Sequence, residues 1–432
     1  MIDFLATLRP DNGLAELFEV RPPSPPVDLM WRVVVRMAAG RHADRRPGEA
    51  LTPRVVGAYG HSRTDTLARG VGEAVERYAL FPEGGAPPGA VRGTLRELGS
   101  RALPFHRPDV ALGDPDAVDE PLTWYPARRL RDDGEVLVPA PLVDYPDHSA
   151  EAGAFDPSPS GAASGQGAEM ALRSALLETV ERDAFTVAWE RRLRLPRVRV
   201  DLDAAGDVPG GKENARRRSL RALWRKAEQA GLVPLVADLP TGLPGITCSV
   251  GVVLDEKRPA PLATVGCNAT DDPWWSMLGA LQEALQIRSV VVNSWDDRER
   301  GRAPAVIAND DDRLRYVASE DGHRCVSEWV EGFTGTREPR PRVQVPTEEI
   351  VRYLVEDGAD PVAVDLTHRL PAPLREMGWA AMKVITVGYQ PLRLVEDHPF
   401  TWNAHRLRTA QARTGCPAGP ASRCPSRPHP LP

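Results

Sequence analysis

Two copies of one acidic motif are the residues of this chain best suited to chemistry. In each copy a glutamate is followed three positions later by a second glutamate and then by an arginine: Glu73, Glu76 and Arg77, and Glu178, Glu181 and Arg182. A looser third copy has an amide in the second position: Glu283, Gln286 and Arg288. Residues three positions apart share one face of a helix, so each polar pair should project from its helix together.

The two glutamate pairs indicate a metal site. If their helices pack side by side, four carboxylates converge, and they cannot all stay ionised without a cation. Oxygen ligands suit Mg²⁺ or Ca²⁺, and Mg²⁺ is usually held by a few carboxylates together with substrate phosphates. We therefore expect a nucleotide as well, with Gln286 and Arg288 donating to its phosphates. For a single copy a solvated charged helix face is the simpler interpretation, but the repetition favours a site.

Three amphipathic helices are predicted to carry these motifs. Residues 64–80 show helical apolar spacing, with Thr64 or Asp65 available as the N-cap. Residues 169–193 form the strongest predicted helix, because no proline or glycine interrupts it, and the small residues of SGAASGQG before it permit a close backbone approach. The third helix is predicted to begin at Asp272 and Pro273, an N-cap followed by proline at the first helical position.

Short apolar runs with strand character separate these helices. The runs TCSVGVVLD and LATVGCNAT are predicted to pair, and DPVAVDLT and AAMKVITV are strand-like on either side of a short connection. Strands and helices alternate without a regular βαβ period. The predicted fold class is therefore α+β, with mixed β-sheets packed against long helices.

Charge and composition exclude several classes of function. The 432 residues carry a formal charge of -6, which argues against sequence-independent nucleic-acid binding. No run approaches the ~18 consecutive apolar residues of a membrane span, and the start lacks the zones of a signal peptide, so we expect a cytoplasmic protein. There is no GxxxxGK[ST], and neither cysteines nor histidines show metal-ligand spacing. Carboxylates, amides and arginines must carry the chemistry.

In this arrangement the chain resembles the YcaO family. The matching segments are GHSRTDTLARGVGEAVERYAL, SGAASGQGAEMALRSALLETVERDAF, LGALQEALQIRS, VITVGYQPL and PHPLP. A doubled ExxER followed by ExxQxR is far more specific than any one segment. The matches predict an N-terminal extension over residues 1–55 and a YcaO-like catalytic domain over residues 56–432, which includes the proline-rich tail 416–432.

The resemblance implies a YcaO-like fold with an ATP and Mg²⁺ site between the acidic helices, and an azoline-forming cyclodehydratase of ribosomal peptide biosynthesis. A Cys, Ser or Thr side chain of the precursor peptide would attack the preceding carbonyl, the oxyanion would take the γ-phosphate, and loss of phosphate would close a thiazoline or oxazoline ring. Carried over residue by residue, the Mg²⁺ ligands are Glu73, Glu76, Glu178 and Glu181, and the nucleotide contacts are Arg69, Gln166, Glu169, Gln286 and Arg288.

Several positions depart from the pattern of the family. Arg69 stands in place of a serine, Gln166 in place of the common asparagine, and Met170 in place of a nucleotide-contacting glutamate, with Glu169 next to it. These departures keep open a non-catalytic scaffold that binds a peptide or a partner enzyme. A second alternative is thioamide or amidine formation on the same scaffold, with the same ATP chemistry and a different nucleophile.

The chain ends in a proline-rich segment that we expect to reach the site. Proline fixes φ and favours an extended chain, and PHPLP matches the terminal motif of the family. The resemblance places this segment at the active site, with the α-carboxylate of Pro432 or the ring of His429 as a base. The first fifty residues show no leader-binding motif, so a separate partner protein is expected to present the precursor peptide. The sequence leaves open whether the chain forms a homodimer.

Overall fold

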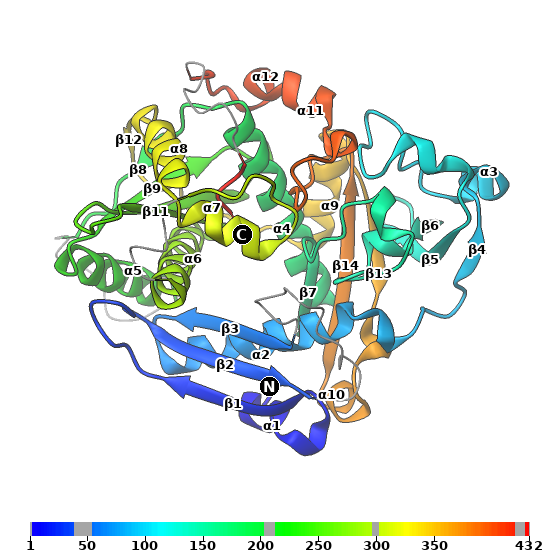
Figure 1. Cartoon of the computed structure of the whole chain (residues 1–432), viewed down its shortest axis with the longest axis horizontal. Helices are drawn as coiled ribbons and strands as arrows, with labels where there is room; N and C mark the ends of the chain where they lie inside the picture. The colour runs from blue at the N-terminus through cyan, green and yellow to red at the C-terminus, as the bar shows by residue number, and fades with distance from the viewer. Residues whose placement is uncertain (1, 39–53, 203–211, 296–301, 420–427, 432) are drawn as a thin grey trace.

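A computed structural model describes residues 2–38, 54–202, 212–295, 302–419 and 428–431, which fold into three β-sheets packed with helices. Figure 1 shows one sheet at the bottom of the view, one on the left and one on the right, with the helices α2, α4 and α6 between them. The α+β class predicted from the sequence is confirmed. None of the helices in the described ranges is long and apolar enough to cross a membrane.

The N-terminal sheet consists of three antiparallel strands, β1 (Ala15–Arg21), β2 (Trp31–Met37) and β3 (Val55–Gly60). The short helix α1 (Phe4–Thr7) precedes it, and α2 (Arg63–Leu80) packs on the face that carries Val33 and Val35. Strand β2 pairs directly with β3, with Val35 opposite Val56. The predicted boundary between residues 55 and 56 therefore falls inside β3, and the described residues before it contribute two strands to the sheet on which α2 packs.

The second sheet has the strand order β11-β10-β9-β8-β12. Its strands are β8 (Pro196–Val198), β9 (Val233–Leu239), β10 (Thr247–Asp255), β11 (Leu262–Thr270) and β12 (Thr334–Arg337). Side chains alternate between two cores: Val252 packs with Trp329 and Phe185, whereas Val253 packs with Leu278. Helices therefore cover both faces: α5 (Lys212–Gln229) and α6 (Pro273–Ser294) on one side, and α4 (Ala168–Glu190) and α8 (Glu320–Glu331) on the other. Helix α7 (Asp310–Val317) contacts α8.

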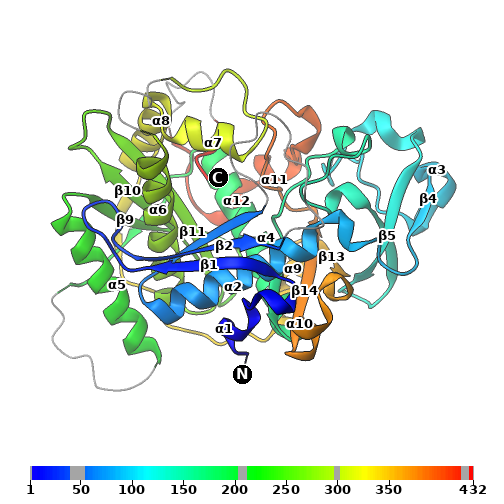
Figure 2. The ribbon, with the colours of Figure 1, turned by 60° about the horizontal axis from the view of Figure 1, so that its bottom comes forward.

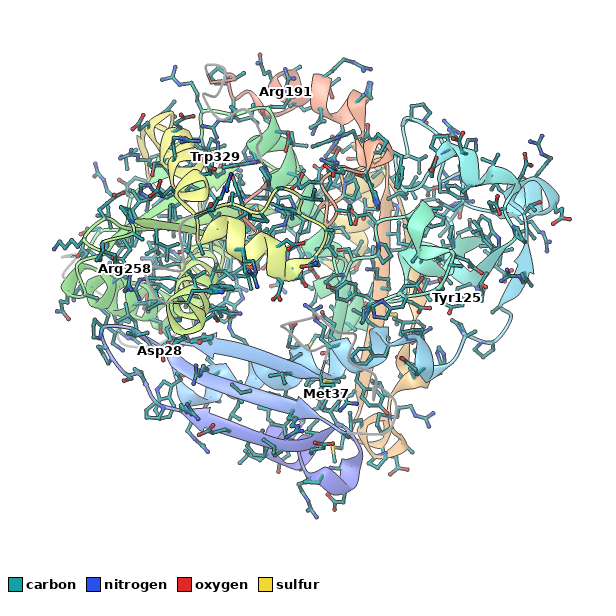
Figure 3. The ribbon with its side chains drawn as sticks, in the orientation of Figure 1. Asp28, Met37, Tyr125, Arg191, Arg258 and Trp329 are labelled. Atoms are coloured by element: carbon teal, nitrogen blue, oxygen red, sulfur yellow. The ribbon has the colours of Figure 1, made fainter. Side chains whose placement is uncertain are left out.

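The third sheet has the order β4-β5-β13-β14-β7, with β6 paired to β5. Its strands are β4 (Val91–Gly93), β5 (Leu122–Arg129), β6 (Glu135–Pro139), β7 (Ala162–Gln166), β13 (Asp360–Asp365) and β14 (Trp379–Val387). The remaining helices are α3 (Leu95–Leu98), α9 (Thr347–Glu356), α10 (Ala372–Glu376), α11 (Ala404–Arg408) and α12 (Ala410–Thr414). Figure 2 shows α2 running beneath the N-terminal sheet toward β14. Figure 3 marks Trp329 and Tyr125, which belong to cores on opposite sides of the molecule.

The three helices predicted to carry the acidic motifs are confirmed. Helix α2 begins one residue earlier than expected, because the hydroxyl of Ser62, rather than Thr64 or Asp65, caps it by accepting from the Asp65 backbone N–H at 3.2 Å. Helix α6 has the expected cap of Asp272 followed by Pro273. The predicted close backbone approach before α4 is confirmed, because a Cβ on Gly161 would lie 2.2 Å from the Val384 carbonyl oxygen of β14.

Helix α2 is seated on its sheet by a glycine. A Cβ built on Gly70 would lie 2.2 Å from Cγ1 of Val33, whose stiff side chain is fully buried in β2. We expect Gly70→Ala to lower the free energy of unfolding by about 1–3 kcal/mol through overpacking. Gly72→Ala is the control, since its Cβ would only meet the Ser164 hydroxyl at 3.6 Å. Equal stability of the two variants in urea denaturation would contradict this account of the packing.

Candidate active site

Helices α2, α4 and α6 present their acidic motifs to one cavity of roughly 820 Å³. The Ser164 hydroxyl of β7 donates to the Gly72 carbonyl of α2 at 2.8 Å, and β7 leads directly into α4, so this strand fixes α2 relative to α4. The cavity is lined by the four predicted metal-binding glutamates and by further polar side chains of α2, α4, α6 and the β11 region: Glu73, Glu76, Glu178, Glu181, Arg69, Arg77, Arg182, Asn268, Glu283 and Gln286.

Each acidic helix carries its own counter-charge one turn away. The Arg77 guanidinium donates to Glu73 Oε1 at 2.8 Å, and that of Arg182 donates to Glu178 Oε1 at 3.3 Å. Glu181 instead accepts from the Ala269 backbone N–H of β11 at 3.0 Å. These contacts orient the carboxylates, and the four glutamates outnumber the two arginines that belong to their motifs.

The crowding of carboxylates shows in their pKa values. Burial, followed by the charges of Glu73 and Glu178, raises the pKa of Glu76 well above its ordinary range. Burial is also the largest cause of a raised pKa at Glu178, and it raises the pKa of Glu181 to about 8. The same cause raises the pKa of Glu283. A cation bound in the cavity would lower these pKa values, as is expected of carboxylates that form a metal site.

The residues present fit Mg²⁺ bound together with a phosphate-bearing ligand. Within the described ranges, no three acidic, imidazole or thiol groups are close enough to enclose an ion by themselves. Mg²⁺ commonly keeps water and phosphate oxygens among its ligands, so a complete protein cage is not required. Polar atoms of the cavity wall that lack a hydrogen-bond partner include Nη1 of Arg182, a donor suited to phosphate, and Oδ1 of Asn268, an acceptor.

Arg69 is held at the cavity wall by a polar network between α2 and α6. Its Nη2 donates to Oε1 of Gln282 at 2.9 Å, and its Nε lies 3.4 Å from Oδ1 of Asp65. Burial acts to raise the pKa of Asp65, but the hydrogen bond from His61 and the charge of Arg69 outweigh it and lower the pKa to about 2. The guanidinium also stands 5.6 Å from the ring centroid of Trp275. The network presents a fixed cation to the cavity.

Only one member of the predicted Gln286 and Arg288 pair lies at the cavity. Gln286 is half-buried at the wall, where its Oε1 accepts from the Tyr59 backbone N–H at 3.3 Å. Arg288 points to the opposite side of α6: its guanidinium contacts Asp255 at 2.8 Å and donates to the Val27 carbonyl at 2.9 Å. Arg288 thus joins β10 to the N-terminal region and does not line the cavity, and its phosphate contact stays a prediction.

Gln166 and Glu169 also lie away from the cavity. Both are exposed, at the end of β7 and the start of α4, and Glu169 lines a separate surface groove with α9. Met170 lines the cavity instead. Gln166 and Glu169 therefore lie outside this cavity, and their nucleotide contacts stay predictions.

The end of the chain returns to the same cavity. His429 and Leu431 line it and are 2% and 0% exposed, although Pro432 lies outside the described residues. The Nε2 of His429 is 2.5 Å from the Arg393 carbonyl, which requires a proton on Nε2 and leaves the lone pair on Nδ1. Burial and the charge of Arg313 lower the pKa of His429 well below its ordinary value, so the ring is neutral. The neutral ring keeps a lone pair on Nδ1, but its lowered pKa makes it a weaker base than an exposed imidazole.

Two site residues carry roles that sequence reasoning did not assign. Glu283 lines the cavity on α6 and accepts from the Cys267 backbone N–H at 2.5 Å. The sequence feature that could have identified Glu283 is its place as the first acid of the third motif. Lys383 is buried in β14 and donates to the Ser158 and Ser160 carbonyls at 2.6 and 2.7 Å. Burial lowers its pKa to about 8, against the opposing effect of Glu178. A lone lysine within an apolar strand was its only signal.

The raised pKa of Glu181 predicts how stability depends on pH. Between its ordinary value of 4.5 and about 8, the native state binds a proton that the unfolded state has released, so stability falls as pH rises through this window. We expect the melting temperature of the metal-free protein to fall over that range, and to fall less steeply in Glu181→Gln. The exposed Glu169→Gln variant should keep the wild-type slope. Identical slopes for wild type and Glu181→Gln would contradict the assignment.

The fold and the carboxylate-rich cavity define the class of this protein as an α+β domain for a nucleotide and Mg²⁺. A sequence model described as YcaO cyclodehydratase, binding ATP and Mg²⁺, matches residues 57–390. The chain belongs to the YcaO family, and ATP and Mg²⁺ are the cofactors of that family.

Two further proteins and two solved structures are similar to this chain. The chain is 27% identical over 349 residues to an uncharacterized protein of Methanothermobacter thermautotrophicus, covering 77% of this chain and 80% of the relative. It is 27% identical over 222 residues to an uncharacterized protein in the tfuA 3′ region of Rhizobium leguminosarum bv. trifolii, covering 49% of this chain and 50% of that one.

Among solved structures, a heterocyclase in complex with substrate and cofactor superposes with a TM-score of 0.71 at 18% identity, covering 96% of this chain and 55% of that chain. This chain therefore spans little more than half the length of that heterocyclase. YcaO from Methanopyrus kandleri, bound with AMPPCP and Mg²⁺, gives a TM-score of 0.59 at 20% identity and covers 97% and 93%. At these identities the structures show a shared fold.

Proposed function

We propose that this chain is an ATP-dependent cyclodehydratase that converts Cys, Ser or Thr residues of a ribosomal precursor peptide to thiazolines or oxazolines. The observation that supports this most directly is one cavity in which buried carboxylates of three helices face arginines and a neutral histidine. Negative groups for Mg²⁺, cations for phosphate and a proton acceptor are the three requirements of amide activation by phosphoryl transfer.

Each group has a stated role in this proposal. Glu73, Glu76, Glu178 and Glu181 would hold Mg²⁺, with Glu283 beside them. Arg69 and Arg182 would bind phosphate oxygens, and Gln286 would orient the nucleotide. When bound, ATP supplies the phosphoryl group that turns the amide oxygen into a leaving group. His429, neutral and unpartnered at Nδ1, would accept the proton that the amide nitrogen loses as phosphate leaves and the C=N bond of the ring forms, and the α-carboxylate of Pro432 is the proposed alternative base.

Mass measurement tests the reaction. The protein is incubated with Mg²⁺, ATP, a precursor peptide encoded beside its gene and any leader-binding partner. Loss of the mass of one water per modified residue, with stoichiometric phosphate release, is expected for ring formation. Replacement of oxygen by sulfur when a sulfide source is supplied would show thioamide formation instead. No mass change and no phosphate release would overturn both enzymatic readings and favour the scaffold.

We also propose that a separate protein presents the leader of the precursor peptide. Strands β1 and β2 are committed to the sheet that seats α2, so they belong to the framework of the site. Gel filtration should show co-elution of labelled precursor peptide with this chain only when the partner is added. Tight binding of the leader by this chain alone would contradict the proposal.

A further inference from the structure

Arg313 of α7 is a buried cation outside the acidic motifs. It is 1% exposed, although arginine is rarely buried to that extent unless its charge is paired. Its Nη1 lies 2.5 Å from Oε1 of Glu396, which supplies the opposite charge. In Figures 1 and 2 the described end of the chain passes α7 beside the mark C.

The guanidinium joins α7 to two segments that are distant in sequence. Its Nη1 also donates to the His429 carbonyl at 2.9 Å. Its Nη2 donates to the Arg393 and Leu394 carbonyls at 2.8 and 2.9 Å. A planar group with five donors in a fixed geometry can make all these contacts, whereas the three donors of a lysine converge on one atom and cannot span them.

The same network holds His429 from its other side. The His429 backbone N–H donates to Oε1 of Glu396 at 3.2 Å, and its ring Nε2 meets the Arg393 carbonyl at 2.5 Å. Arg313 thus binds the His429 carbonyl directly, and it contacts the two groups, Glu396 and the Arg393 carbonyl, that bind the backbone N–H and the ring of His429. Leu431, two residues further, is fully buried among Phe185, Trp189 and Trp329.

We propose that Arg313 is a positioning residue that fixes residues 428–431 in the wall of the carboxylate cavity. Without its guanidinium, the His429 carbonyl loses its donor and Glu396 loses its closest cation. The segment would then be held by Leu431, by the bond from the His429 ring to the Arg393 carbonyl and by the remaining contacts of Glu396. The catalytic consequence of this tether rests on the proposed function, because it is the ring of His429 that the tether aligns. The binding of residues 428–431 by Arg313 does not depend on the proposed function.

Hydrogen exchange tests the tether without any assay of activity. In Arg313→Lys, which keeps a positive charge opposite Glu396, exchange of the His429 amide should be at least tenfold faster than in wild type. Arg313→Met should give the same or a larger effect. Arg315→Met is the matched control, since Arg315 is exposed on the same helix. In this variant the His429 amide should exchange at the wild-type rate. Unchanged exchange in Arg313→Lys would overturn the proposal.

A double-mutant cycle that combines Arg313→Lys with deletion of residues 428–432 tests whether Arg313 affects catalysis through His429. Arg313→Lys should lower kcat for ring formation at least tenfold and leave the KM for ATP unchanged. In a chain that lacks residues 428–432 the same substitution should change the remaining rate by less than twofold, because its target is gone. An equal effect in both backgrounds would mean that Arg313 acts elsewhere, and would overturn the proposal. If the proposed function is wrong, no variant turns over, but the difference in hydrogen exchange persists.

Discussion

Replacing Glu178 and Glu181 together by glutamine should lower ATP-dependent phosphate release by on the order of 10³-fold while the chain remains folded. Both side chains face the cavity from α4, and burial raises their pKa values, so a cation in the cavity would favour their ionised forms. Glutamine keeps their shape and removes the charge that Mg²⁺ would require. It also keeps an oxygen for the Ala269 backbone N–H that Glu181 accepts.

The measurement is phosphate release at saturating ATP, with the melting temperature recorded alongside. Removing like charges from a crowded cavity relieves repulsion, so the metal-free variant should melt at or above the temperature of the wild type. Glu169→Gln is the control on the same helix, because Glu169 is exposed and off the cavity, and it should retain wild-type turnover. Substantial phosphate release by the double variant would refute the metal assignment.

The helices of the site were predictable from the sequence because local signals define them. The cap of α6 at Asp272 and Pro273 lies within three residues of the helix it starts, and the apolar spacing of α2 and α4 reports on their buried faces. The convergence of the two ExxER motifs was also predictable, since a repeated pair of acids on two amphipathic helices has little other use. The role of residues 15–37 was not, because pairing of β2 with β3 bridges a stretch of chain that carries no periodic signal.

The individual contacts at the edge of the site could be predicted only in part. Gln286 and Arg288 are two positions apart on α6 and therefore point in different directions, so a shared role conflicts with helix geometry. Arg288 found its partner in Asp255, on a strand whose position only the fold determines. Glu169 was predicted to contact the nucleotide because it is next to Met170. Consecutive side chains on a helix point in directions about 100° apart, and of these two residues only Met170 lines the cavity.

The proline-rich end shows why composition alone misleads. Pro428 and Pro430 flank His429 in a segment that is polar and turn-rich by composition, and such segments are usually solvated. Here Leu431 inserts into an aromatic core and Arg313 binds the His429 carbonyl. The energy of this docking comes from groups more than one hundred residues away, which no local pattern could report.

Removal of residues 428–432 should suppress ring formation to a small residual rate and leave nucleotide binding within about twofold of wild type, because every proposed Mg²⁺ and phosphate ligand lies on α2, α4 and α6. The shortened chain loses the fully buried Leu431, so its free energy of unfolding should fall by about 2–5 kcal/mol. Ring formation is measured by mass and ATP binding by calorimetry, both well below the melting temperature of the variant.

Point substitutions separate the chemistry of the tail from its packing. His429→Ala keeps Leu431 in the core and removes the imidazole of the segment. If His429 is the base, this variant should reproduce the loss of azoline formation with little loss of stability. Leu431→Ala should instead lower stability and slow the reaction less. Pro428→Ala, which leaves both buried side chains in place, is the control. Wild-type ring formation by His429→Ala, together with its loss in the shortened chain, would reject the histidine and leave the carboxylate of Pro432 as the base. Full activity of the shortened chain would exclude the segment from the reaction, and the neutral imidazole in the cavity wall would then be a packing residue.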